Sequence, residues 1–169
     1  LTATGYFRRD MMADFEELGE TLDFARDKLP GFRVIHNSGN ILHDSGATVS
    51  QEIAFTLAMG NEYLVQLSGM NYPLKDILNH MQFEFSIGSS YFMAIAKLRA
   101  TRYLWSRILE AHSKDASKLP PMFILSETSK WNQTLYDPHV NMLRGTTEAM
   151  SAILGVTDSL TVQPFDLPL

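Results

Sequence analysis

Cysteine is absent from the 169 residues, so the chain has no disulfide framework, no thiol nucleophile and no thiolate metal site. Long apolar runs are absent too, since none approaches the roughly 20 residues that a membrane-spanning helix needs. The residues from Leu1 to Asp10 also lack the ordered regions of a signal peptide. These absences predict a cytoplasmic protein without a membrane segment.

Basic residues are the minority charge, with 14 Lys and Arg against 19 Asp and Glu and a formal net charge of -5. This balance leaves no broad basic face, so we expect no nucleic-acid partner. The apolar content of 45% can fill a core, and the length suits one domain of roughly 100–200 residues. Because the chain lacks an initiator Met and ends abruptly at Leu169, we interpret residues 1–169 as a single partial domain of a longer protein.

The spacing of apolar residues divides the chain into alternating helices and strands. Apolar residues three or four apart predict helices over 11–29, 48–67, 90–109 and 138–154. Thr48 and Gln51 have the spacing of a capping box, Pro138 suits a first helical turn, and Gly155 suits a C-terminal cap. Short β-favouring runs predict strands over 32–36, 81–87, 122–125 and 159–162.

Four helix–strand units in this order predict an α/β fold with parallel strands and right-handed crossovers. Two architectures satisfy the pattern, a doubly wound sheet and a partial (β/α)₈ TIM barrel. A complete barrel needs eight strands, so four strands would form half of one. In both architectures ligands meet the carboxyl ends of the strands, which here are followed by 36–44, 86–90, 126–134 and 163–166.

Polar residues are concentrated in these segments. His36, Asn37, His43 and Asp44 form the richest group, which is suited either to acid–base chemistry or metal binding, or simply to loop hydrogen bonding. Glu127 beside Ser126, and Asp166 after Gln163, fall on neighbouring strand ends, so they form either a carboxylate pair for catalysis or a polar rim.

Two other groups of residues allow a functional and a plainer interpretation. Lys97, Arg99 and Arg102 either contact nucleotide phosphates or form the solvated side of an amphipathic helix. The run from Asp137 to His139 resembles the start of a cobalamin-binding Asp-x-His-x-x-Gly motif, but Met142 replaces the glycine. We therefore predict no metal ligand in this chain.

Several longer blocks strongly resemble the methylmalonyl-CoA mutase family. They are SGAT at 45–48 with QEIAFTLA at 51–58, IAKLRATRYLW at 95–105, DPHVNMLRGTTEA at 137–149 and DSLTVQPFD at 158–166. The resemblance runs from about residue 32 to the end. It implies the later half of the substrate-binding (β/α)₈ barrel of an isomerase that interconverts succinyl-CoA and methylmalonyl-CoA with adenosylcobalamin.

Departures from the catalytic members distinguish this chain within the family. The resemblance implies a Tyr-His pair where Asn40 and Ile41 stand, and that histidine lies at the reacting acyl group. It also implies CoA-holding Arg and Ser where this chain has His80 and Gln82, a Gln at position 127 and an Asn at position 163. The chain is more similar to the small, non-catalytic subunits of heterodimeric bacterial members.

This resemblance implies a large catalytic subunit as partner, with the acyl-CoA substrate bound in the complex and adenosylcobalamin bound by the large subunit. No residue of this chain is then catalytic, and no cofactor is expected on it. The candidate residues at the barrel mouth are His43, Asp44, Ser126, Glu127 and Gln163.

Two alternatives remain at this point. One is an active acyl-CoA mutase barrel of changed specificity, in which His43, Glu127 and Gln163 replace the usual polar set. The other is a flavodoxin-like binding module, although no phosphate-binding glycine loop is present. A half-barrel also leaves two open sheet edges, so we expect the isolated chain to self-associate.

Overall fold

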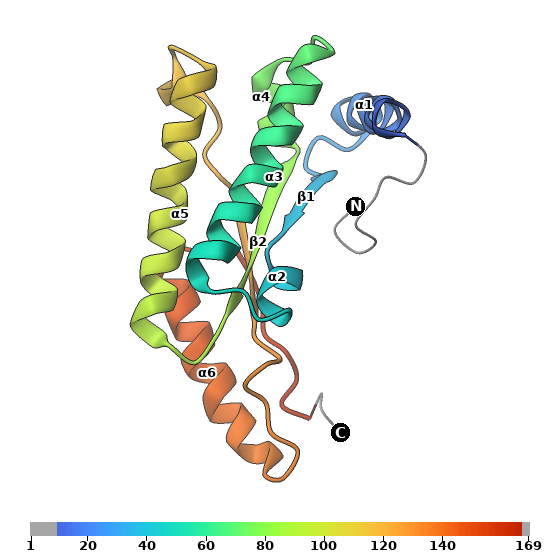
Figure 1. Ribbon diagram of the computed structural model, residues 1–169. Coiled ribbons are helices and arrows are strands. Elements are labelled where there is room, and N and C mark those ends of the chain that lie inside the picture. Colours follow the sequence, from blue (N-terminus) through green and yellow to red (C-terminus); the bar gives the residue numbers. More distant parts are fainter. Residues whose placement is uncertain (1–9, 167–169) are drawn as a thin grey trace.

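The computed structural model describes residues 10–166, which fold into helices alternating with four strands (Figure 1). Over those residues, none of the helices combines the length and apolar character that crossing a bilayer requires. In chain order the elements are α1 (Met11–Lys28), β1 (Ile35–Ser38), α2 (Asn40–Asp44), α3 (Val49–Gly69), α4 (Leu74–Asn79), β2 (Met81–Ile87), α5 (Tyr91–His112), the 3₁₀ helix η1 (Ala116–Lys118), β3 (Ile124–Thr128), α6 (Pro138–Leu154) and β4 (Ser159–Thr161).

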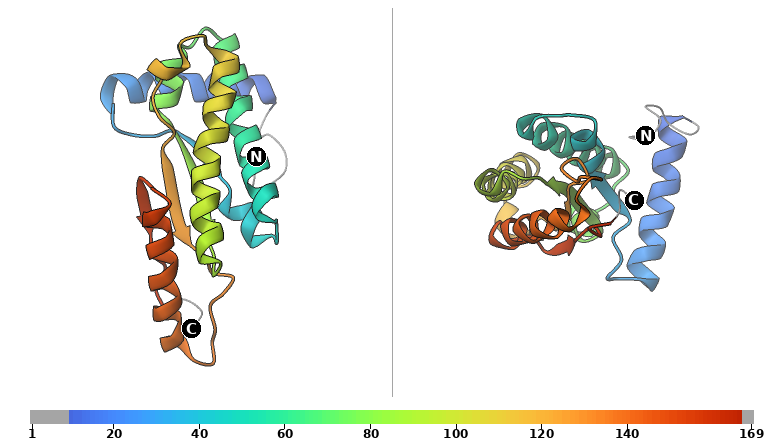
Figure 2. Two further views of the ribbon diagram at one scale, coloured as in Figure 1. Left: turned by 90° about the vertical axis from the view of Figure 1, so that its left-hand side faces the viewer. Right: turned by 90° about the horizontal axis from the view of Figure 1, so that it is seen from below.

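The strands form one parallel sheet in the order β1-β2-β3-β4, so each strand pairs with the next along the chain. Helices α3, α5 and α6 lie in a row on one side of the strands, while α1 lies apart from that row (Figure 2). A doubly wound sheet reverses its strand order and carries helices on both faces. The sequential order is that of a partial (β/α)₈ barrel, which confirms the predicted fold class and excludes the flavodoxin-like alternative.

Local capping signals place the helix starts. The Thr48 side chain accepts from the Gln51 backbone N–H, and the Gln51 side chain accepts from the Thr48 backbone N–H, which forms the predicted capping box of α3. Asp10 caps α1 through the backbone N–H of Ala13. Pro138 occupies the first turn of α6, as predicted.

The core lies between the sheet and the helices packed on it, and α1 and α4 contribute to it as well as α3, α5 and α6. Phe83 and Trp105 meet edge to face, with ring centroids 4.7 Å apart. Gly60 of α3 lies directly over this pair, and a Cβ at that position would approach the Phe83 ring to 2.6 Å. The glycine that weakens α3 by its helix propensity is therefore required by the close approach of α3 to the sheet.

The end of α6 differs in detail from the prediction. Gly155 is the C-cap, but its φ of -75° is right-handed, and the left-handed backbone falls on Val156 with φ 66°. A Cβ on Gly155 would lie 2.6 Å from Leu98 Cδ1. Glycine is thus needed for the contact between α6 and α5 rather than for its backbone freedom.

The predicted bounds of the first and third strands were wrong at both ends, and two short helices were not predicted. Strand β1 begins at Ile35 and β3 begins at Ile124, and each runs two or three residues past its predicted end into polar sequence. Backbone pairing with β2 extends both strands, because parallel ladder bonds depend on the neighbour and not on side-chain hydropathy. The short helices are α2 and α4.

Candidate functional site

The face of the sheet that the row of helices leaves uncovered is polar. In the parallel register, alternate residues of each strand share a face. Phe83 and Phe85 point to the covered side, so the intervening residues of β2 and their partners on β1 and β3 line the other side. The residues of this open face are His36, Ser38, Gln82, Glu84, Ser86, Leu125, Glu127, Ser159 and Thr161.

Glu84 is the centre of one hydrogen-bonded group on the open face. Its Oε2 atom lies 3.2 Å from His36 Nε2 and accepts a 2.6 Å hydrogen bond from Ser38 Oγ. Gln82 Nε2 lies 2.9 Å from His36 Nδ1. Because an amide nitrogen can only donate, Nδ1 accepts and Nε2 carries the proton that His36 donates to Glu84.

These donors change the acidity of Glu84. The hydrogen bond from His36 lowers the pKa of the Glu84 carboxyl, burial opposes it, and the hydrogen bond from Ser38 lowers it further. The net pKa is below the usual value for glutamate. Glu84 is therefore an ionised acceptor at neutral pH and is not suited to donate a proton.

A second group ties together the carboxyl ends of the strands. Ser86 Oγ donates to Asn40 Oδ1, and Asn40 Nδ2 donates a 2.8 Å hydrogen bond to Glu127 Oε2. Gln163 Nε2 donates to the other oxygen of Glu127, and Lys130 Nζ lies 3.4 Å from it. The polar atoms contributed by α2, β2, β3 and the segment after β4 thus satisfy one another.

Behind this group lies a buried ion pair between α3 and α5. Glu52 is 0% exposed, and its Oε2 atom lies 2.8 Å from Nζ of Lys97, which is 4% exposed. Glu52 Oε1 also accepts from the backbone N–H of Ser86 at 3.0 Å, while Lys97 donates to the Ser86 carbonyl. Both charged groups therefore bind the backbone of Ser86 near the end of β2.

The pKa values of the pair reflect this enclosure. Burial raises the pKa of Glu52, but the nearby His43 and the charge and hydrogen bond of Lys97 outweigh it and bring the pKa below its usual value. Burial lowers the pKa of Lys97, and Glu52 offsets part of that effect. His43 lies between Glu52 and Ser129. Its Nδ1 atom is 3.8 Å from Glu52 Oε2, and its Nε2 atom is 2.9 Å from Ser129 Oγ.

The five candidate mouth residues occupy different positions. Glu127 and Gln163 are in direct contact, and His43 lies at the buried pair. Asp44 is exposed at the end of α2. Ser126 is 0% exposed and pairs in register with Phe85, so it belongs to the covered side and does not reach the open face.

The wider polar candidates are also separated by the fold. Asn37 is buried on the covered side, whereas His36 is on the open face. Asp166 is exposed, and Glu127 meets Gln163 instead of forming a pair with it. Arg99 and Arg102 donate to backbone carbonyls around the end of α6, so they hold helices together and are not arranged as a nucleotide phosphate site.

Sequence reasoning missed Glu52, and for Lys97 it offered a phosphate contact or the solvated side of a helix, whereas Lys97 is buried and paired with Glu52. A signal was present, because Lys97 falls on the same helical stripe as Ala94, Leu98 and Thr101, all of which are buried. Glu52 likewise interrupts the apolar stripe of α3 beside Ile53. Opposite charges on the buried stripes of two neighbouring helices are typical of a buried ion pair.

Few side chains at this site are placed to transfer a proton or to bind a metal ion. Ile41, at the position where the family resemblance implies a reacting histidine, is an exposed aliphatic side chain of α2 that neither donates nor accepts a proton. Within residues 10–166, no group of three or more His, Cys, Asp or Glu residues is placed to hold a metal ion. The polar side chains at the strand ends are largely engaged with one another, as Glu127 is with Asn40 and Gln163.

Comparison with known proteins gives the family. A profile described as methylmalonyl-CoA mutase matches residues 1–169. The chain is 42% identical, over 86% of its length, to the methylmalonyl-CoA mutase small subunit of Porphyromonas gingivalis and covers 24% of that protein. It is 36% identical to the methylmalonyl-CoA mutase of Rhizobium meliloti, over 88% of this chain and 21% of the relative.

The large subunit from Porphyromonas gingivalis is 34% identical over 88% of this chain, which covers 21% of it. An open parallel sheet with helices along one side, together with a family match over the whole chain, is that of a partial α/β barrel. The chain belongs to the methylmalonyl-CoA mutase family. It spans about a quarter of the length of the small subunit that it matches.

Proposed function

We propose that this chain is part of a small, non-catalytic mutase subunit that supports a large subunit in interconverting succinyl-CoA and methylmalonyl-CoA. The observation that carries the proposal is the set of contacts made by Asn40 and Ile41 at the carboxyl end of the sheet. Asn40 is bonded to Ser86 and Glu127, and Ile41 supplies no polar atom beside them. The higher identity to a small subunit, 42% against 34% for the large subunit of the same organism, supports it.

The residues present do not fit adenosylcobalamin, whose cobalt chemistry generates the radicals when the group is bound. Four of the five histidines are engaged, His36 with Glu84, His43 with Ser129, His80 with the Phe32 carbonyl and His112 with Asn61. The fifth, His139, stacks on Phe165. We therefore assign the cofactor to the large subunit.

The proposal is tested by isolating the full-length polypeptide that carries this chain from its native lysate. We expect a larger homologous chain to co-purify. Conversion of succinyl-CoA to methylmalonyl-CoA is then assayed with and without adenosylcobalamin, for each chain alone and for the pair. Turnover by this polypeptide alone, or its binding of an acyl-CoA by calorimetry, would favour the active barrel of changed specificity.

A substitution in this chain separates the two functions more sharply. Glu127→Gln keeps the size of the side chain but removes the charge that an altered active site would use. For a non-catalytic subunit we expect kcat and KM of the reconstituted pair to stay within about twofold of the unaltered pair. The exposed change Glu62→Gln on α3 is the matched control, and a drop in kcat confined to Glu127→Gln would reject the proposal.

A further inference from the structure

Two glutamates of this chain take up side-chain donors on the open face. In the β2–β3 register Glu84 pairs with Leu125, so Glu127 lies two residues farther along the same face. Glu84 accepts from His36 Nε2 and Ser38 Oγ. The Glu84 and Glu127 side chains are each 13% exposed, so both carboxylates border the space that a ligand of the open face would enter.

Glu127 receives nitrogen donors on both of its oxygens. Asn40 Nδ2 donates a 2.8 Å hydrogen bond to Oε2, and Gln163 Nε2 donates to Oε1. The ammonium group of Lys130 lies 3.4 Å from Oε1, and its side chain is 50% exposed. Since all three groups offer N–H, the form of Glu127 that accepts from them is the ionised carboxylate. Two negative charges, those of Glu84 and Glu127, therefore lie on this face.

This arrangement is unfavourable for a ligand that carries its own carboxylate. Ligands of a (β/α)₈ barrel bind at the carboxyl ends of the strands, where Glu127 and the donors around it lie. An incoming carboxylate would meet two like charges, and like charges brought together across an interface are repelled. It would also find these donors already bonded, and an anion that leaves water without a donor pays its desolvation in full.

We propose that Glu84 and Glu127 are specificity-determining residues that exclude acyl-CoA compounds with a carboxylate on the acyl group, because their own carboxylates occupy the donors that such a compound needs. Succinyl-CoA and methylmalonyl-CoA both belong to this class. The inference rests on the proposed function and extends it. Ile41 removes a proton-transferring side chain from the mouth, whereas the two glutamates keep the substrate itself away.

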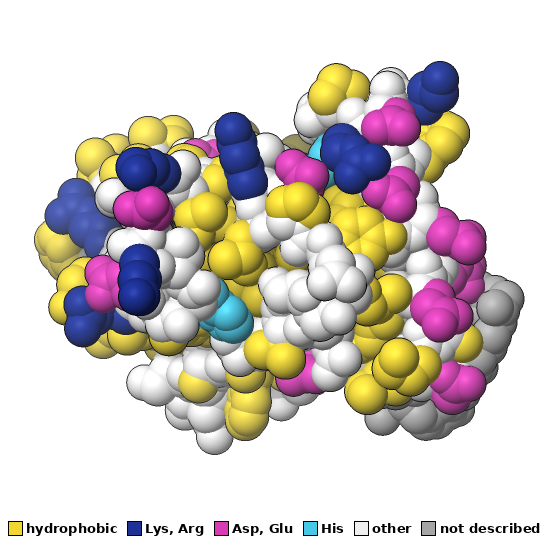
Figure 3. Space-filling model, turned by 90° about the horizontal axis from the view of Figure 1, so that it is seen from above, with side chains coloured by type: hydrophobic (Ala, Val, Ile, Leu, Met, Phe, Trp, Pro, Cys, Tyr) yellow, Lys and Arg dark blue, Asp and Glu magenta, His cyan; other side chains and the backbone are white. Residues whose placement is uncertain are grey.

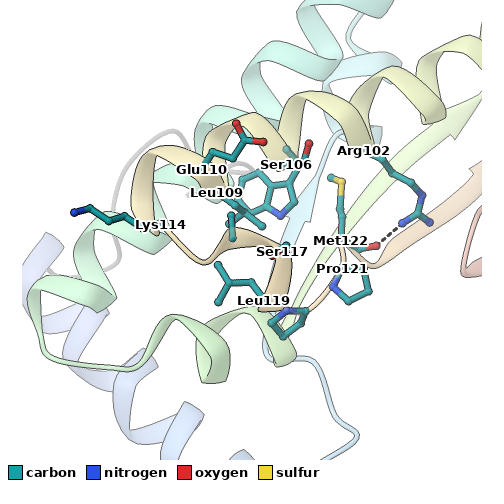
Figure 4. A pocket seen from close by; sticks show the side chains of 12 residues that line it. Arg102, Ser106, Leu109, Glu110, Lys114, Ser117, Leu119, Pro121 and Met122 are labelled. Carbon is teal, nitrogen blue, oxygen red and sulfur yellow. Dashed lines mark hydrogen bonds between the residues drawn. The ribbon is translucent and has the colours of Figure 1, made fainter.

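Two features at the other end of the sheet could hold a CoA compound without regard to its acyl group. A cavity of about 620 Å³ lies between the last turns of α5 and the connection to β3, where Leu109, Leu119 and Met122 supply an apolar lining (Figure 4). Seen from that end, basic side chains gather over α5 and acidic ones over the α1 side (Figure 3). A basic surface attracts the phosphates of any CoA compound, so the test needs a probe that differs only in its acyl group.

The test measures binding to the full-length polypeptide that carries this chain, by calorimetry with succinyl-CoA and butyryl-CoA. The two acyl groups have the same number of carbons, but only the succinyl group ends in a carboxylate. The unaltered polypeptide is expected to bind neither with a Kd below about 1 mM. Glu84→Gln combined with Glu127→Gln should bind succinyl-CoA about tenfold more tightly or better, and butyryl-CoA little more than before.

Three control variants locate the effect. Glu62→Gln with Glu110→Gln removes two exposed carboxylates from the helix row and should produce no gain. Ser117→Phe fills the exposed rim of the cavity and, added to the double variant, should leave the gain unchanged. Lys130→Met, added in the same way, should abolish the gain, because Lys130 is the cation left for the substrate carboxylate.

The outcomes separate this inference from the proposed function. Binding of succinyl-CoA by the unaltered polypeptide would reject the proposed function and the exclusion with it. Absence of a gain in the double variant, with its fold verified by circular dichroism, would overturn the exclusion alone, as would an equal gain for butyryl-CoA. If the double variant does not fold, Glu127→Gln alone is measured, and a gain of about threefold confined to succinyl-CoA is expected.

Discussion

The two faces of the sheet are built from alternate residues of the same strands, yet they are stabilised in different ways. On the covered face, Phe83, Phe85 and Ile87 are at most 1% exposed and pack under helices. On the open face, Glu84 accepts a hydrogen bond from Ser38 of β1, and Glu127 accepts one from Asn40 of α2. Barrel interiors are usually filled by branched apolar residues, so a polar lining here indicates a face that does not serve as a packed core.

The two faces also differ in how strongly a charged side chain affects the stability of the fold. A buried charge on the covered face must be fully paired, as Glu52 and Lys97 are, because water cannot reach it. A charge on the open face keeps some access to solvent, since the Glu84 and Glu127 side chains are each 13% exposed. The same type of residue therefore has a large structural effect on one face and a small one on the other.

The largest expected effect concerns the uncovered parts of the molecule as a whole. Strands β1 and β4 each pair on one side only, and Leu143 and Met150 of α6 are 69% and 51% exposed. We expect the isolated 169-residue chain to self-associate, at twice the monomer mass or more by gel filtration with light scattering. Leu143→Lys with Met150→Lys should lower that mass, and a stable monomer of the unaltered chain would contradict the prediction.

Next in size is the loss of the buried pair. Lys97→Met leaves the Glu52 carboxylate without its cation inside the protein, so the free energy of unfolding should fall by about 3–5 kcal/mol. Urea unfolding at neutral pH measures the loss. The control is Lys97→Met combined with Glu52→Gln, which removes both charges and should regain more than half of the stability. An equal loss in the single and double variants would show that packing, and not charge, sets the effect.

The smallest effect is expected on the open face and depends on pH. The pKa of Glu84 is lowered in the folded protein, so its contribution to stability is present above the ordinary glutamate value of 4.5 and is lost as the pH falls through the lowered value. Glu84→Gln should cost about 1 kcal/mol at pH 7, and this difference should shrink as the pH is lowered. Urea unfolding across this pH range provides the measurement.

Glu148 is the control of opposite sign. Burial raises the pKa of its carboxyl, and the hydrogen bond from Asn132 offsets only part of this. A raised pKa stabilises the fold at low pH and is a disadvantage as the pH rises, so Glu148→Gln should become relatively more stable with rising pH. Parallel pH dependence in the Glu84 and Glu148 variants would contradict at least one of the two assignments.

The helices could be predicted because their signals are local. The capping box at Thr48 and Gln51, the proline at the start of α6 and the apolar stripes each act within a few residues along the chain. The ends of β1 and β3 could not be predicted in this way, because ladder pairing with β2 extends both strands into polar sequence. The open-face network has the same origin, since Asn40 and Glu127 are 87 residues apart.

By itself, the sequence determined the order of the main helices and strands, the parallel architecture and the family resemblance. Only the tertiary structure decided that Lys97 is buried on Glu52, that Ser126 points away from the mouth, and that Trp105 leaves an indole N–H unpaired. The physical reason is range. Propensity and capping act between near neighbours, whereas burial and charge pairing depend on which segments the fold brings together.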